Sequence, residues 1–183
     1  MAAGRTITRV LILWAALLAT CALPAAGMFA WLVIADPFGG SPHPTDETML
    51  TQFRAQRKSL EELVRMIAED PKLVRLAPDF TRPEDAGSGG VSADRIAVYR
   101  RLCANAGIAH GFSHYGDAIE FIVHTRGLAI SGSAKGFDYA PSADADATVV
   151  EGDLDAAAAS ATDKDVLFER KIDESWWLLL DMR

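Results

Sequence analysis

The feature that most constrains this chain is a run of 25 residues without a charged side chain, Val10 to Ile34. A helix rises about 1.5 Å per residue, so a helical run of this length crosses an apolar layer of roughly 30 Å. Arg5 and Arg9 precede the run, and the next lysine or arginine is Arg54. Because basic flanks stay in the cytoplasm, the sequence predicts a transmembrane signal anchor, a cytoplasmic tail at residues 1–9 and an extracytoplasmic C-terminal part.

Two other N-terminal signals share a basic start and an apolar core. One alternative is a secretory signal cleaved after Ala35, although signal cores usually span about 7–15 residues and this run is longer. The other is a lipoprotein signal in which Cys21 is acylated, although Thr20 is a poor residue just before such a cut. We expect a retained anchor, which implies a single pass through the cytoplasmic (inner) membrane with the lipid bilayer as its partner and a periplasmic domain.

The rest of the chain divides into a stalk and one domain. Three prolines and two glycines fall within residues 35–45, a composition that resists regular structure and separates membrane from domain. The remaining length is enough for one domain with its own core. We therefore expect a tail at 1–9, an anchor at 10–34, a stalk at 35–45 and an extracytoplasmic domain at 46–183.

The part of the chain after the anchor is acidic. Removing Arg5 and Arg9 from the 18 basic residues leaves 16 against 25 acidic residues, a formal charge of −9. Nucleic acid and anionic lipid surfaces attract positive fields, so this charge argues against general binding to either. A basic protein partner or a cation is better matched.

Cysteine usage excludes a disulfide within the domain. Only Cys103 lies beyond the anchor, so the domain must be stabilised by core burial. Ile96, Tyr99 and Cys103 share one helical face, which favours a buried cysteine over a nucleophile.

Two amphipathic helices are expected at the start of the domain. Thr45 is an N-cap candidate for the first, whose apolar residues recur at helical spacing until Asp70 and Pro71 end it. Ser92 is the N-cap candidate for the second, and Gly107 is its expected stop. Residues 71–91 are predicted to form a loop whose first half is held to the core by four apolar side chains, namely Leu73, Val74, Leu76 and Phe80.

The hydrophobic period then changes from helical to alternating. Gly116-Asp117 is a favoured hairpin pair, and placing Tyr115 opposite Ala118 sets the register of the two strands around it. The predicted strands cover residues 108–115, 118–125, 128–133, 166–172 and 175–182. A short helix capped by Asp153 or Asp155 is expected in the acidic segment 138–165, which holds few large apolar residues. The predicted fold class is α+β: two amphipathic helices, a mainly antiparallel sheet of about five strands, and a short peripheral helix.

Five residues are candidates for binding a partner. Trp176 and Trp177 begin a strand that is apolar on both faces, which indicates either an interior strand or one that contacts another protein. Tyr115, Glu120 and His124 lie on the hairpin face that points away from the predicted core.

No catalytic or metal-binding motif emerges. His110 and His114 lie about 13 Å apart on one predicted strand face, too far to share zinc, and His124 faces the other way. The Asp144-x-Asp146 start of a calcium loop lacks the later glycine and glutamate. Ser131 and Ser133 lie where a strand is expected to end in a turn, outside any serine-nucleophile motif.

Three classes of function follow from these patterns. The preferred one is a membrane-anchored bacterial envelope protein that binds another protein or acts as an accessory module, with no cofactor. A small-ligand module would need an apolar pocket lined by Phe112, Phe121, Phe137 or Tyr139. A hydrolase would need His114 near Ser131, Ser133 or Asp117. Lys135-Gly136-Phe137 followed by the Trp176-Trp177 strand resembles small bacterial envelope proteins, a resemblance that names no family and assigns no functional residue.

Overall fold

The computed structural model describes residues 41–127, 132–163 and 165–182. The predicted tail, the predicted anchor and the start of the predicted stalk lie outside these residues. Within the described part, no helix combines the length and the apolar character that crossing a membrane requires. The fold below is that of the unit that begins at Ser41.

Three helices and an eight-stranded sheet make up this unit, so the α+β class is confirmed. The strand order is β2-β1-β3-β4-β5-β8-β7-β6, and every neighbouring pair is antiparallel except β6 and β7. In chain order the elements are α2 (Asp46–Glu69), β1 (Arg75–Leu76), β2 (Thr81–Arg82), the 3-10 helix η1 (Ala86–Gly89), α3 (Ala93–Ala106), β3 (Phe112–Tyr115), β4 (Ala118–Arg126), β5 (Ser133–Tyr139), β6 (Thr148–Val149), α4 (Leu154–Ser160), β7 (Leu167–Lys171) and β8 (Trp176–Asp181).

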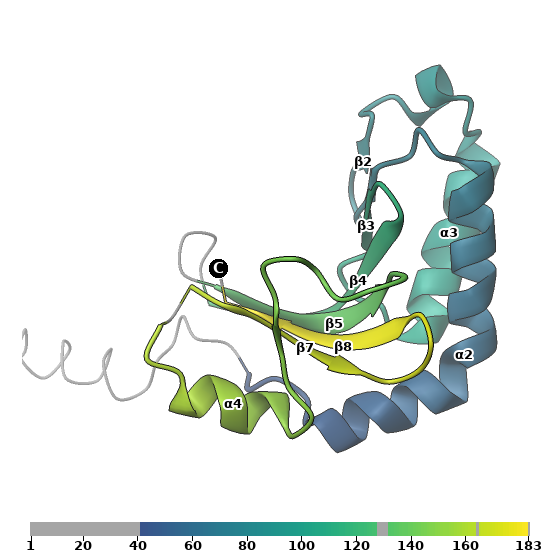
Figure 1. Cartoon of the computed structure of the whole chain (residues 1–183). Helices are drawn as coiled ribbons and strands as arrows, with labels where there is room; N and C mark the ends of the chain where they lie inside the picture. Colours follow the sequence, from purple (N-terminus) through teal and green to yellow (C-terminus); the bar gives the residue numbers. More distant parts are fainter. Residues whose placement is uncertain (1–40, 128–131, 164, 183) are drawn as a thin grey trace, which may run out of the picture. The chain divides into compact units, whose positions relative to one another are not determined.

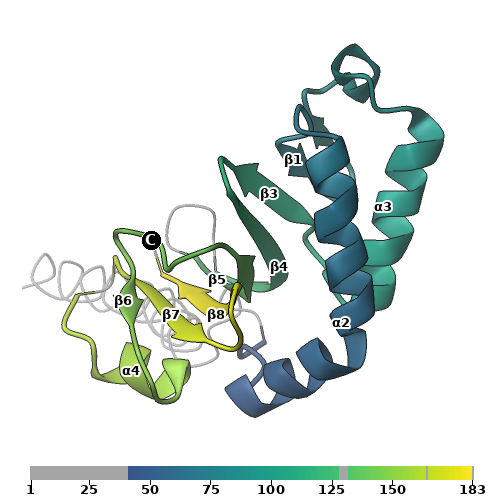
Figure 2. The same cartoon turned by 45° about the vertical axis from the view of Figure 1, so that its right-hand side comes forward.

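The helices begin and end where the capping residues predict. Thr45 accepts the N–H of Thr48 at the start of α2, and Ser92 accepts the N–H of Arg95 at the start of α3. Gly107, with a φ of 73°, ends α3 in the left-handed conformation that glycine adopts without strain. Asp153 caps α4, as one of the two expected alternatives. In Figures 1 and 2, α2 and α3 lie side by side, and α4 lies beside β7.

The expectation of about five strands was too low. Three of the eight strands, β1, β2 and β6, are only two residues long, which is too short to produce an alternating pattern in the sequence. The loop 71–91 therefore contains two strands. Leu73 and Leu76 are buried in it as predicted, but Val74 and Phe80 are exposed.

The third long strand also lies later than expected. A strand ending at Ser133 was predicted, whereas β5 begins there and continues to Tyr139. The prediction missed it because Lys135, Gly136 and Asp138 are poor strand formers, and tertiary contacts decide their conformation. Gly136 has a steric role: a Cβ atom there would lie 2.1 Å from the carbonyl oxygen of Phe121, next to the irregular pairing of β4 around Val123.

One face of the sheet and the helices share an aromatic core. Phe53 of α2 lies 5.6 Å from Phe137 and 5.3 Å from Trp176, measured between ring centroids. Trp176 also stacks on Phe121. The predicted hairpin register is confirmed, with Tyr115 opposite Ala118, and β8 is an interior strand between β5 and β7. Cys103 is buried, and burial raises the pKa of its thiol to about 12.

Candidate functional site: an acidic cleft on the sheet

The face of the sheet opposite the aromatic core carries acidic side chains on its central strands. Phe121, Phe137 and Leu178 are paired across β4, β5 and β8 and face the aromatic core. Because side chains alternate along a strand, the preceding register row points to the opposite face. That row pairs Glu120 with Asp138 and then Asp138 with Trp177, so two carboxylates of neighbouring strands lie side by side.

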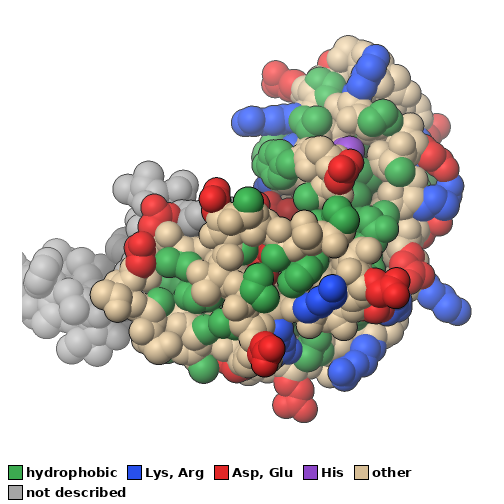
Figure 3. All heavy atoms as spheres, viewed as in Figure 1, with side chains coloured by type: hydrophobic (Ala, Val, Ile, Leu, Met, Phe, Trp, Pro, Cys, Tyr) green, Lys and Arg blue, Asp and Glu red, His purple; other side chains and the backbone are tan. Residues whose placement is uncertain are grey.

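These carboxylates lie in a cleft of 540 Å³. Its walls come from the β3–β4 hairpin, from β5 with the following loop 140–144, and from β7 and β8. In the space-filling view, acidic side chains lie in and around a hollow of the molecular surface (Figure 3). Six carboxylate residues line the cleft, and none of its described lining residues is a lysine, arginine or histidine: Asp117, Glu120, Asp138, Asp144, Glu169 and Asp181.

Two of the six carboxylates belong to the protein interior. Asp138 is 6% exposed and Glu169 is 2% exposed. The pKa of Asp138 is raised to about 7, chiefly by burial and then by the nearby charges of Glu169, Glu120 and Asp144, against the opposing effect of the hydrogen bond from the Tyr139 N–H. Glu169 accepts the backbone N–H of Asp144 at 2.9 Å, which joins β7 to the loop after β5.

An exposed aromatic ring stands at the rim of the cleft. Tyr115 is 66% exposed and lines both the cleft and a second groove of 360 Å³, whose other lining residues are Val74, Arg75, Phe80 and Arg82. Tyrosine is enriched at protein interfaces because its ring supplies apolar area and its hydroxyl a hydrogen bond. The cleft therefore combines concentrated negative charge with an accessible aromatic side chain.

The structure brings two of the five predicted partner-binding residues to the cleft, Tyr115 and Glu120. Trp177 lies on the same sheet face, but it is 6% exposed and its Nε1 donates to the carbonyl oxygen of Ala140 at 3.3 Å. Trp176 is in the aromatic core. His124 lies outside the cleft lining, where its Nδ1 is 3.0 Å from the Nδ1 of His43.

Sequence reasoning missed the carboxylates of the strands beyond the hairpin. Asp138 was assigned to an acidic loop, and Glu169 was one acidic residue in a predicted strand. Their proximity depends on the pairing of β5 with β8 and of β8 with β7, which no local pattern reveals. The only available signal was the formal charge of −9, which gives the sign of the surface but no location.

The histidine–serine contact in the described structure differs from the expected one. His114 Nε2 is 2.9 Å from the carbonyl oxygen of Gly116, in the hairpin turn. Ser133 instead lies 2.7 Å from Nε2 of His43, a residue that the sequence analysis did not single out. Their separation by 90 positions explains why no motif indicated the pair. Ser131 lies outside the described residues.

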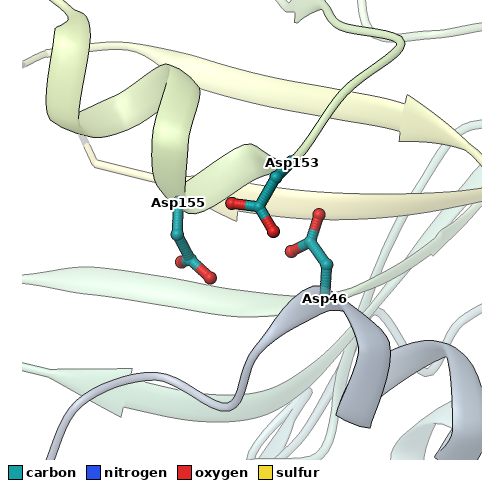
Figure 4. A group of neighbouring side chains, drawn as sticks. All are labelled: Asp46, Asp153 and Asp155. Atoms are coloured by element: carbon teal, nitrogen blue, oxygen red, sulfur yellow. The ribbon is translucent and has the colours of Figure 1, made fainter.

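Three aspartates lie close enough together for their carboxylates to hold a metal ion. Asp46, at the start of α2, and Asp153 and Asp155, at the start of α4, direct carboxylates toward one another (Figure 4). Lys135 Nζ lies 2.8 Å from Asp46 and 2.7 Å from Asp155, and Arg170 lies 3.0 Å from Asp46. The positive side chains of Lys135 and Arg170 already balance charge among these aspartates. The three residues therefore fit an ion-pair network better than a metal centre.

The aromatic residues proposed for a small-ligand pocket serve the core. Phe112, Phe121 and Phe137 are fully buried, and Phe112 and Phe121 lie 6.2 Å apart between ring centroids. None of them lines the acidic cleft.

Comparisons with protein-family models, with curated proteins and with solved structures found no match to this chain.

Proposed function

We propose that this chain is a bacterial envelope protein, anchored in the cytoplasmic membrane through residues 10–34, whose extracytoplasmic domain binds a basic segment of another protein in the acidic cleft. The observation that carries the proposal is the cleft lining, with six carboxylate residues and no basic residue among the described ones. The uncharged run and its basic N-terminal flank support the anchor.

Electrostatics favour a cationic occupant. A buried carboxylate close to other negative charges is costly, and here the raised pKa of Asp138 means that it takes up a proton near pH 7. A lysine or arginine side chain that enters the cleft brings a positive charge close to Asp138 and favours the release of that proton. The negative potential of the six carboxylates also speeds the encounter with a basic partner, most strongly at low ionic strength.

The dimensions of the site favour a peptide segment over a single metal ion. The volume of 540 Å³ is that of a site for several side chains, and a metal ion would need ligand atoms that converge on one point. Tyr115 at the rim offers an apolar contact for the part of the partner that lies next to its basic residues.

Affinity capture with matched variants tests the proposed binding. Glu120→Gln combined with Asp144→Asn removes two charges from the cleft, and Asp163→Asn combined with Asp165→Asn removes two exposed charges outside it. The immobilised wild-type chain and the control should retain the same basic envelope proteins, and the cleft variant should lose them. Equal retention by both variants would show that binding depends on overall charge and would reject the cleft.

The anchor has its own test. After fractionation of cells that express the full chain, an uncleaved anchor keeps the chain in the membrane pellet through alkaline carbonate washing. External protease should digest the domain in spheroplasts. A carbonate-soluble chain would contradict the anchor without affecting the account of the cleft.

A further inference from the structure

A hydrogen-bonded chain of four side chains lies outside the acidic cleft. Ser133 Oγ is 2.7 Å from His43 Nε2, His43 Nδ1 is 3.0 Å from His124 Nδ1, and His124 Nε2 is 2.9 Å from Ser41 Oγ. The four residues come from the segment before α2, from β4 and from β5. None of them lines the acidic cleft.

The contacts define a consistent set of protons. If Ser133 donates to His43 Nε2, then His43 carries its own proton on Nδ1 and donates it to His124. His124 then carries its proton on Nε2 and donates to Ser41. A serine, a neutral imidazole that accepts its proton, and a third group that orients the imidazole form the arrangement that activates a serine hydroxyl for nucleophilic attack.

We propose that Ser133 is an activated nucleophile with His43 as its general base, that His124 positions His43, and that the group hydrolyses small carboxylic esters. Ser133 Oγ attacks the ester carbonyl while its proton passes to His43 Nε2. The alkoxide leaves with that proton, and an acyl-serine remains. Water then attacks the acyl group and gives a proton to His43, which returns it to Ser133 as the acid is released. This activity is independent of the proposed binding of a basic partner.

The surroundings of His43 keep it neutral. Burial is the largest effect that lowers its pKa, and the positive charges of Lys135 and Arg126 and the proximity of His124 act in the same direction. Asp155 acts in the opposite direction, and the resulting pKa is about 4. The imidazole is therefore a proton acceptor over the whole range in which the domain would operate. The rate of ester hydrolysis should stay level from about pH 8 to pH 5 and fall as the pH approaches the pKa of His43.

Labelling with diisopropyl fluorophosphate tests the nucleophile directly. In this reaction the Ser133 Oγ–phosphorus bond forms, the phosphorus–fluorine bond breaks, and the hydroxyl proton passes to His43. The full-length chain in mild detergent should gain one diisopropylphosphoryl group, located at Ser133 by peptide mass spectrometry, with release of fluoride. It should also hydrolyse p-nitrophenyl acetate, and His43→Gln should lower both rates at least about 100-fold, the usual contribution of a general base.

Three variants separate catalysis from a structural role. Ser133→Ala should abolish labelling, and Ser88→Ala, at an exposed serine remote in sequence, should leave it unchanged. His124→Gln should lower the hydrolysis rate and shift its pH profile while the thermal midpoint of the wild type is kept. A folded wild-type chain that gains no label, or that is labelled at another residue, would overturn the proposal. Equal labelling of His43→Gln and wild type would also overturn it. The four residues would then have only a structural role, holding the segment before α2 to the sheet.

Discussion

The fold clearly alters the ionisation of Asp138, one of the carboxylates of the cleft. Its pKa rises from 3.8 to about 7, so the folded state holds a proton that the unfolded state releases between these values. The free energy of unfolding is therefore highest, as far as Asp138 affects it, below about pH 4. It decreases as the pH rises toward 7 and is constant above that. A shift of this size corresponds to at most about 4 kcal/mol.

Asp138→Asn should remove this pH dependence. The free energy of unfolding of the variant should match that of wild type near pH 4, exceed it increasingly up to about pH 7 and stay above it by a constant amount at higher pH, because asparagine carries no charge to bury. Urea denaturation at several pH values measures the difference. Parallel stability curves of variant and wild type across this range would show that Asp138 ionises as freely in the fold as in the unfolded chain.

Lys135 is a second residue whose burial determines how strongly its substitution should affect stability. Its side chain is 0% exposed and contacts Asp46 and Asp155, whose side chains are 4% and 41% exposed. Replacement by methionine leaves the buried carboxylate of Asp46 in an ion pair with Arg170 but without Lys135, and we expect the free energy of unfolding to fall by about 3–5 kcal/mol. Asp155→Asn is the control. It keeps the buried Lys135–Asp46 pair and should cost clearly less, because the side chain of Asp155 is 41% exposed. Equal losses in urea denaturation would contradict this ranking.

At the level of the elements, β5 shows how one glycine controls strand pairing. Alanine at Gly136 would bring its Cβ to 2.1 Å from the Phe121 carbonyl oxygen, which lies in the backbone of the neighbouring strand and cannot move independently. Gly136→Ala should therefore destabilise the domain by about 3 kcal/mol or more, because the two strands must separate. Gly152→Ala is a matched control, since no atom lies within 4 Å of its added Cβ. Similar thermal midpoints for the two variants would disprove the close approach.

Elements that are defined by local sequence signals could be predicted, and elements that depend on pairing between distant segments could not. Helices α2 and α3 could be placed from the sequence because Thr45, Ser92 and Gly107 are local caps next to a helical apolar period. The β3–β4 hairpin could be placed because Gly116-Asp117 sets its register. Strand β5 could not, since its residues are poor strand formers and its position depends on pairing with β4 on one side and with the distant β8 on the other. The candidate site depends on β5, which explains why Tyr115 and Glu120 of the hairpin were found and Asp138 was missed.

For the whole molecule, the acidic charge has a location as well as a sign. The formal charge of the chain is −7, and six acidic residues share one cleft. A charge that was spread evenly would keep the protein soluble and weakly attract any cation. Because the acidic residues of the cleft are concentrated beside Tyr115, they favour a partner that places basic residues next to an apolar one. The pKa of Asp138 also predicts how binding depends on pH. Binding of a cation should weaken as the pH falls below about 7, because protons compete for Asp138.

Fluorescence anisotropy of a labelled octa-arginine peptide, titrated with the full-length chain at pH 8, tests the cleft most directly. The account predicts that Glu120→Gln with Asp144→Asn weakens binding at least about tenfold, equivalent to about 1.4 kcal/mol. Asp163→Asn with Asp165→Asn, which has the same net charge, should change it less than about twofold, as expected for exposed charges outside the site. Tyr115→Ala should weaken binding without altering its salt dependence. Equal affinities of the two charge variants would contradict the acidic cleft as the binding site.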